Sequence, residues 1–251
     1  MKLTAAAAIL VSCVPSLSFA QRIGSGWTFL NYPSGGLNDI TFPFNIAKAP
    51  HQTGYQFTQE FYFQNVSESE FGTIGLQPRR DVKGKSIIQA TFQSFLPGTT
   101  TKHANCNKGT DGVTSANGVA SVSCAVEIDG NYSHTYNLVV ENTKDTTWRG
   151  TLVDTVTHKS SVVGEWTLPK GTGKLVNGAG GYVNYYPWNN KPKVKCNTLP
   201  STEVTVYGPT SKTKGASGGE IRIVIQFGLC VNEDAFSLKK VSNGYEIKLG
   251  F

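Results

Sequence analysis

The feature that most constrains this chain is a two-residue alternation of apolar and polar side chains, which predicts β-strands. Aromatic and β-branched residues carry the alternation, and no stretch has the 3.6-residue period of an amphipathic helix. About ten segments follow the strand pattern. They are residues 55–63, 86–95, 119–128, 136–141, 148–157, 161–168, 181–186, 203–207, 220–228 and 245–251.

Turn-forming pairs separate many of these segments, and they favour short connections between neighbouring strands. The pairs are Asp111-Gly112, Asn117-Gly118, Asp129-Gly130, Asn177-Gly178 and Asn243-Gly244. Because strands and turns alternate without helices, we predict an all-β fold, either a β-sandwich or a jelly roll with little helix. No internal repeat or low-complexity linker divides the chain, so we expect residues 21–251 to form a single domain.

The first twenty residues have the composition of a secretory signal peptide. A positive start at Lys2 precedes an apolar stretch over residues 5–14, and a small-x-small site ends at Ala20. Losing Lys2 lowers the net charge from +6 by one, to +5. No later run of ~18 apolar residues exists to form a membrane span. We therefore expect a secreted, extracellular protein that starts at Gln21, in solution or associated with a cell wall.

The cysteines agree with an oxidising compartment. One of the five leaves with the signal peptide, and the mature chain keeps Cys106, Cys124, Cys196 and Cys230. Four cysteines allow three pairings, and sequence order favours Cys106 with Cys124 and Cys196 with Cys230, because each pair closes a local excursion between expected strands. No C-x-x-C motif occurs, so we expect structural disulfides and neither a metal site nor a cofactor.

Two further features concern modification and partners. The sequons at Asn65 and Asn131 could carry glycans in a host that secretes through the endoplasmic reticulum, and both would then lie at the surface. The dense basic stretch at 79–85 lacks the stacking aromatics of a nucleic-acid groove, so we interpret it as a solvated loop. We expect a monomer that does not bind nucleic acid.

The order of several motifs resembles a known family. The motifs are Phe71-Gly-Thr-Ile-Gly-Leu-Gln77, the strand at 87–95, the Cys106 and Cys124 pair, and Trp148-Arg-Gly-Thr-Leu-Val-Asp154. This order resembles a family of secreted β-sandwich proteins of unknown function, common in actinobacteria and also found in fungi. The chain has Gln93-Ser94-Phe95 where that family usually has tryptophan. The resemblance implies a concanavalin-like or jelly-roll sandwich and supplies no activity.

Candidate catalytic groups lack partners in the sequence. Glu127 and Asp129 resemble part of the acidic strand of laminarinase-like glycosidases, but the second glutamate is missing, so we interpret them as acids at a hairpin end. The terminal strand from Tyr245 resembles that of alginate lyases and also fits a plain amphipathic strand. No Gly-x-Ser-x-Gly motif occurs, and no motif surrounds the four histidines, which are His51, His103, His134 and His158.

Exposed aromatics with nearby amides are typical of sugar-binding surfaces. Tyr182, Tyr185, Tyr186, Trp188 and Asn189 form such a group. We therefore predict a non-catalytic protein that binds an extracellular glycan or cell-wall surface. Two alternatives stay open: a β-sandwich carbohydrate-active enzyme, which is a polysaccharide lyase or glycosidase, and a secreted effector or toxin that supports virulence by binding a host or competitor protein. Three tryptophans, Trp27, Trp148 and Trp166, are expected in the core.

Overall fold

The computed structural model describes residues 21–108, 122–189, 191, 193–231, 233 and 236–251. The predicted signal peptide at 1–20 lies outside the described residues, as do the expected turns at Asp111 and Asn117. Within the described ranges, no helix is long and apolar enough to cross a membrane.

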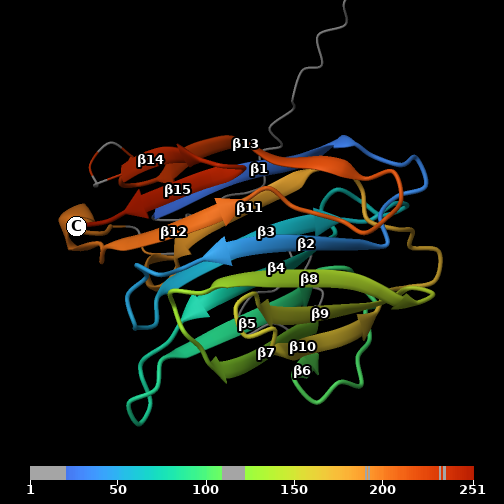
Figure 1. The fold of residues 1–251 in the computed structure, drawn as a ribbon, viewed down its shortest axis with the longest axis horizontal. Helices are drawn as coiled ribbons and strands as arrows, with labels where there is room; N and C mark the ends of the chain where they lie inside the picture. The colour runs from blue at the N-terminus through green and yellow to red at the C-terminus, as the bar shows by residue number, and fades with distance from the viewer. Residues whose placement is uncertain (1–20, 109–121, 190, 192, 232, 234–235) are drawn as a thin grey trace, which may run out of the picture.

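The described residues form two antiparallel sheets that pack face to face (Figure 1). The eight-stranded sheet has the order β13 (Ser217–Gly228), β1 (Gln21–Asn31), β11 (Ala179–Tyr185), β3 (Tyr55–Tyr62), β4 (Phe71–Pro78), β5 (Ile87–Ser94), β7 (Val122–Asp129) and β6 (Cys106–Lys108). The seven-stranded sheet has the order β10 (Ser160–Thr167), β9 (Thr147–Asp154), β8 (Thr135–Lys144), β2 (Asp39–Asn45), β12 (Thr202–Tyr207), β15 (Gly244–Leu249) and β14 (Phe236–Val241). The prediction of an all-β sandwich is confirmed.

The core lies between the two sheets and is rich in aromatic rings. Trp148 and Trp166 are each 1% exposed, and Trp27 is 2% exposed, as expected for core residues. The ring of Trp166 stacks on Phe92 from the opposite sheet at a centroid distance of 4.5 Å, and Phe63 meets Trp148 at 5.1 Å. These contacts join the two sheets through large buried surfaces, which are the main source of stability in such a fold.

Two strands at the start of the chain had no sequence prediction. In β1, glycines at positions 24 and 26 interrupt the alternation of side chains. In β2, three consecutive residues from Ile40 to Phe42 are buried, because this strand lies in the middle of its sheet. Glycines in β1 and Pro43 in β2 therefore obscured the two-residue pattern that identified the others.

Both disulfides join the cysteine pairs that sequence order favours. Cys106 and Cys124 face each other across β6 and β7, and Cys196 is linked to Cys230. Gly164 on β10 approaches the first bridge from the opposite sheet, where an added Cβ would lie 2.4 Å from the Sγ of Cys124. A side chain at residue 164 would therefore clash with the disulfide.

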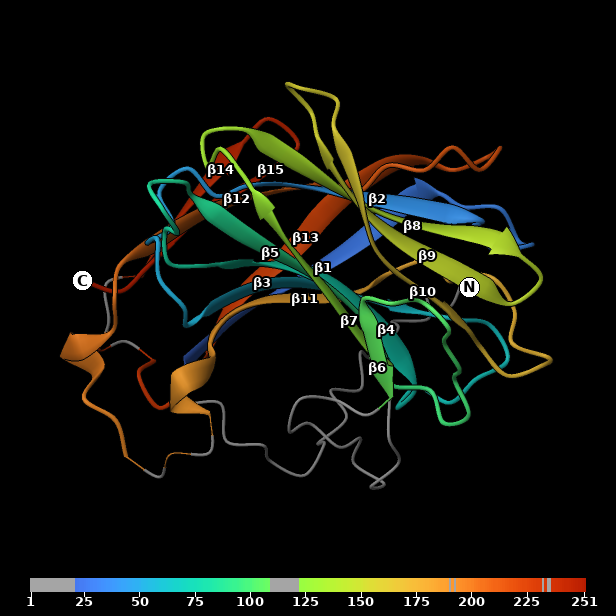
Figure 2. The ribbon, with the colours of Figure 1, turned by 90° about the horizontal axis from the view of Figure 1, so that it is seen from below.

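Two short 3₁₀ turns interrupt the connection between β11 and β12. They are η1 (Tyr186–Trp188) and η2 (Cys196–Thr198), and Figure 2 shows both, in orange, at the end of the sandwich where the chain terminates. The Cys196–Cys230 disulfide fastens η2 to the residues that follow β13.

Candidate functional site

One row across the eight-stranded sheet carries an amide or carboxylate side chain on each of five adjacent strands. Asn184 on β11 faces Gln56 on β3. Gln77 on β4 faces Gln89 on β5, which in turn faces Glu127 on β7. Neighbouring residues in these strands are core residues, so strand alternation directs the five side chains to the outer face of the sheet. We call these five residues the polar row.

Arg79, just after β4, connects one half of the polar row. Its Nη2 atom donates to Gln77 Oε1 at 2.8 Å and to Gln89 Oε1, and its Nε lies 3.4 Å from Glu127 Oε1. A guanidinium group only donates hydrogen bonds, so the oxygen of each glutamine amide must face it. The Nε2 groups of Gln77 and Gln89 therefore face away from Arg79, as possible donors on the outer face of the sheet.

The backbone of Arg79 is held by a tyrosine from a distant turn. The Arg79 N–H donates to the hydroxyl of Tyr132 at 3.1 Å, and that hydroxyl donates to the carbonyl of Ile87 at 2.8 Å. Burial raises the pKa of Tyr132, so the phenol stays protonated. His51 stacks on the Tyr132 ring at 4.0 Å, and its Nδ1 lies 2.7 Å from Asp81 Oδ1.

The prediction of a solvated loop at 79–85 is therefore wrong for its first residue. The side chain of Arg79 is 17% exposed and lies in the polar row, whereas residues 80–85 are exposed as expected. Glu127 was interpreted as an acid at a hairpin end, and its pairing with Gln89 places it in the row instead. Sequence alone showed the polar alternation of each strand but not which positions would face each other.

Asp129, on the same face of β7, is paired with Lys85, and the carboxylate of Glu60 on this outer face is remote from Glu127. Glu60 lies on β3, and strands β4 and β5 separate it from β7, so three strand spacings of ~4.8 Å place the two backbones ~14 Å apart across the sheet. They are also in different register rows, because Glu60 faces Thr73. Glycosidases hold their two carboxyl groups ~5 to 9.5 Å apart, so these two acids do not form such a pair.

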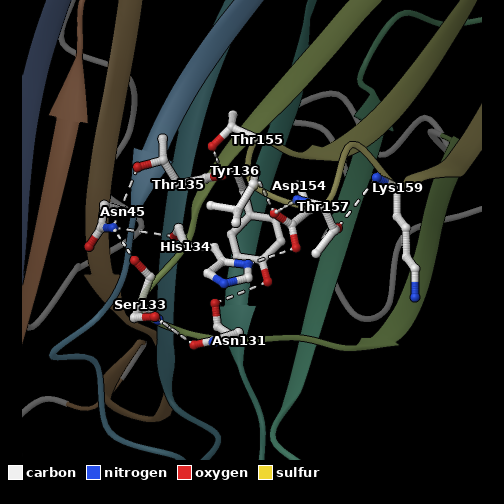
Figure 3. A network of polar contacts seen from close by, with 11 residues as sticks. Asn45, Asn131, Ser133, His134, Thr135, Tyr136, Asp154, Thr155, Thr157 and Lys159 are labelled. Carbon is white, nitrogen blue, oxygen red and sulfur yellow. Dashed lines mark hydrogen bonds and ion pairs between the residues drawn. The ribbon is translucent and has the colours of Figure 1, made fainter.

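A second polar network lies at the end of β8 and β9 (Figure 3). His134 Nδ1 lies 2.9 Å from Asp154 Oδ2, and Asp154 Oδ1 accepts the backbone N–H groups of Val156 at 2.8 Å and Thr157 at 3.2 Å. The Tyr136 hydroxyl donates to the carbonyl of Asn131 at 3.1 Å. We call His134, Tyr136 and Asp154 the turn network, because their contacts hold the turns at the ends of these strands.

The turn network has two shifted pKa values. Burial would raise the pKa of Asp154, but hydrogen bonds from His134, Val156 and Thr157 outweigh it and lower the pKa to about 2. Burial, followed by the charge of Asp154, raises the pKa of Tyr136 to about 12. The Asp154 carboxylate is thus bound by backbone and by one histidine, which is typical of a turn-stabilising role.

The predicted aromatic platform does not form one surface. Tyr182 lies on the outer face of the sheet opposite Thr58, whereas Tyr185 packs on Tyr55 at 5.1 Å and meets the ring of Trp188 edge-on at 5.4 Å. Trp188 is only 8% exposed. The remaining two residues are Tyr186, which begins η1, and Asn189, whose Oδ1 is buried without a partner. The rings of Tyr185 and Trp188 thus pack against each other, apart from Tyr182.

Both sequons lie at the surface, as expected. Asn65 and Asn131 are exposed. The Nδ2 of Asn65 donates to the carbonyl of Gly171 at 3.3 Å, whereas the side-chain oxygen of Asn131 accepts the hydroxyl of Ser133 at 2.8 Å.

A cavity of about 350 Å³ lies away from the polar row, beside β10. Threonines, His103 and Glu165 line it, and Glu165 is paired with Arg149 at 2.9 Å. The cavity lining has one carboxylate and no amide side chain, whereas the polar row combines a carboxylate and several amides with the guanidinium group of Arg79. In the part of the chain that the structure describes, no group of three or more His, Cys, Asp or Glu side chains could hold a metal ion.

The fold is similar to that of solved peptidases. Two crystal structures of scytalido-glutamic peptidase, one with a peptide-based transition-state analogue and one with a transition-state analogue inhibitor, are each 11% identical to this chain, with TM-scores of 0.45 and 0.46. SCP-B, a member of the eqolisin family of peptidases in complex with the tripeptide Ala-Ile-His, is 13% identical with a TM-score of 0.44. Each match covers 93% of this chain and 100% of the other. No family model matches the sequence, and no curated protein does.

The prediction of a non-catalytic protein that binds a glycan or cell surface is wrong. The solved structures of similar fold are peptidases, and Trp188, the largest ring of the expected platform, is buried. Below 25% identity the similarity concerns the fold, and no residue of this chain takes a role from it.

Proposed function

We propose that this chain is a secreted hydrolase that cleaves polypeptides on the outer face of its eight-stranded sheet. One observation carries the proposal: Glu127 lies in register with Gln89 and Gln77, and Arg79 connects all three side chains. The row therefore combines a carboxylate, a guanidinium group and two amide donors on rigid strands. The two disulfides fit the oxidising route of a secreted protein.

The groups support acid–base hydrolysis. Glu127 accepts a proton from a water molecule as the water attacks a peptide carbonyl carbon. The Nε2 groups of Gln77 and Gln89 donate hydrogen bonds to the oxygen that becomes negative, and the positive charge of Arg79 stabilises the same charge. Protonated Glu127 then returns its proton to the leaving nitrogen. Amide side chains also suit a polypeptide substrate, because each offers the same donor and acceptor as a peptide group.

The test is cleavage of a reduced and alkylated, unfolded protein between pH 3 and pH 8. New α-amino groups are counted, and the cut sites are mapped by mass spectrometry. We expect Glu127→Gln to lower the cleavage rate at least ~100-fold, since a positioned general base contributes ~10²- to 10⁴-fold.

Asp129→Asn is the matched control. Asp129 is on the same strand and face, its side chain is 58% exposed against 55% for Glu127, and it pairs with Lys85 rather than Arg79. It should cleave at the wild-type rate. Absence of new termini with the wild-type protein, or equal rates for wild type and Glu127→Gln, would overturn the proposal.

A further inference from the structure

The polar row does not end at Asn184. Asn184 faces Arg22 on β1, and Arg22 faces Phe227 on β13. Phe227 and Glu127 therefore occupy one register row, at opposite ends of seven adjacent strands from β13 to β7. Six strand spacings of ~4.8 Å place their backbones ~29 Å apart, which an extended peptide of about nine residues would cover.

The β13 end of this row is apolar and exposed. Phe227 is 45% exposed and Ile225 is 46% exposed. Gly24 faces Ile225 on one side and Tyr182 on the other, and an added Cβ on Gly24 would lie 2.6 Å from Cε2 of Phe227. The Phe227 ring thus lies over a residue without a side chain, on the outer face, next to another aromatic residue.

Two buried oxygen atoms lie between the apolar end and the reacting end. Asn184 is 2% exposed and its Oδ1 has no hydrogen-bond partner, and Thr58 is 1% exposed with an unpartnered Oγ1. Both are on outer-face positions of β11 and β3. A buried polar atom without a partner is unfavourable, and a peptide that displaces the side chains covering these two oxygens would satisfy them through its N–H groups.

We propose that Phe227 and Ile225 form a subsite for a large apolar side chain, about nine residues from the bond that is cleaved. This inference rests on the proposed function, since it extends the same substrate across the sheet. The positions of these groups fit one occupant: peptide N–H groups satisfy Asn184 in the row and Thr58, two residues from Gln56 along β3, and an apolar side chain covers Phe227. A polysaccharide would supply hydroxyl groups but no apolar side chain for the β13 end.

The test measures binding separately from cleavage. Fourteen-residue fluorescent peptides carry one phenylalanine near the amino end, near the carboxyl end, or nowhere, and fluorescence anisotropy measures their affinity for the Glu127→Gln protein. We expect one phenylalanine position to tighten binding roughly 10- to 100-fold, as burial of one large apolar side chain predicts. Adding Phe227→Ser should remove that gain, and adding Phe227→Leu should retain most of it.

Leu238→Ser provides the control, because Leu238 is 39% exposed on β14 of the other sheet. It should leave the affinity unchanged, and thermal unfolding checks that each variant is folded. Binding that needs phenylalanine and Phe227, without cleavage by the wild-type protein, would support the subsite and overturn the hydrolase. Cleavage whose KM is the same for all peptides and for Phe227→Ser would support the hydrolase and overturn the subsite.

Discussion

The polar row and the turn network use similar residue types in opposite ways. In the turn network, the Asp154 carboxylate is bound by backbone N–H groups and by His134, so its hydrogen-bonding capacity serves the turn itself. In the polar row, Arg79 binds the Oε1 atoms of two glutamines and the carboxylate of Glu127, so the N–H groups of both glutamine side chains face away from it. The comparison shows that an ion pair indicates a reactive site only when neighbouring side chains have hydrogen-bond donors or acceptors that the pair does not use.

The largest expected effect is on turnover. Arg79→Ala should lower the cleavage rate at least ~100-fold, because it releases both glutamine oxygens and removes a positive charge, and loss of one donor to an oxyanion costs ~10²- to 10³-fold. His134→Asn, in the turn network, should leave turnover unchanged. Arg149→Ala, which removes another arginine paired with a glutamate, is the control. A His134→Asn protein as inactive as Arg79→Ala would reverse the assignment of the two regions.

The next effect is on stability, and it should be confined to the turn network. Asp154→Ala removes the acceptor of two backbone N–H groups and the partner of His134, so the free energy of unfolding should fall by about 2 to 3 kcal/mol. Glu127 is exposed, so Glu127→Gln should change the free energy of unfolding by less than about 0.5 kcal/mol. Urea unfolding monitored by tryptophan fluorescence measures both. Equal losses would mean that the polar row is also structural.

The pH dependence of stability should separate the regions further. The folded-state pKa of Asp154 is lowered to about 2 from 3.8, so its ionised form stabilises the protein above pH 3.8, and that stability is lost as the pH falls toward 2. The contribution is about 1 to 2 kcal/mol after allowance for solvent screening. The gap between wild type and Asp154→Asn in urea midpoint should therefore shrink between pH 5 and pH 2. A constant gap would contradict the lowered pKa.

A smaller effect is expected at the tyrosine behind Arg79. Tyr132→Phe removes the hydroxyl that accepts the Arg79 N–H and donates to the Ile87 carbonyl, so that the Arg79 N–H keeps only its 3.2 Å bond to Ile87. The variant should lose about 1 kcal/mol of stability and lower kcat several-fold with KM unchanged. Tyr136→Phe loses a comparable hydrogen bond in the turn network and should keep kcat at the wild-type value. An equal kcat for both variants would show that Tyr132 does not position Arg79.

The smallest effect concerns the sequon that lies between the two regions. Asn131 precedes Tyr132 and accepts the hydrogen bond of the Tyr136 hydroxyl through its backbone carbonyl. Its exposed side chain belongs to neither the polar row nor the turn network. We expect a glycan at Asn131 on protein secreted by a host with an endoplasmic reticulum, and Asn131→Gln to change stability by less than about 0.5 kcal/mol. Peptide mass mapping with and without glycosidase treatment detects it. An unmodified Asn131 would argue against this secretion route.

Much of the fold followed from local sequence. Strand positions such as Tyr55–Tyr62 and Thr202–Tyr207 were predicted within two residues, because one face of each packs and the other meets solvent. The cysteine pairs followed from chain order. Strands β1 and β2 were missed, since glycines break the alternation in one and Pro43 interrupts the other.

The candidate site could not be predicted in the same way. Gln56, Gln77, Gln89 and Glu127 each appeared as a polar position of one strand, and only the register of five paired strands places them in one row. Asn184 joins them through the pairing of β11 with β3, which lie far apart in sequence. Register over such distances depends on the packing of the whole core, and local alternation does not contain it. The aromatic group around Trp188 could be recognised in the sequence because its residues are close together in the chain. The same closeness allows some of these side chains to pack against each other.

The Cys106–Cys124 disulfide also bears on how copies of the protein meet. It fastens the three-residue β6 along β7, at the margin of the eight-stranded sheet. A margin with unpaired backbone groups recruits strands from other molecules, and short covering strands and charged side chains oppose this. Beyond β6, the margin of β7 carries Glu127 and Asp129. Reduction of this one bond would therefore release β6 and promote strand-to-strand association, even where the core between the two sheets stays folded.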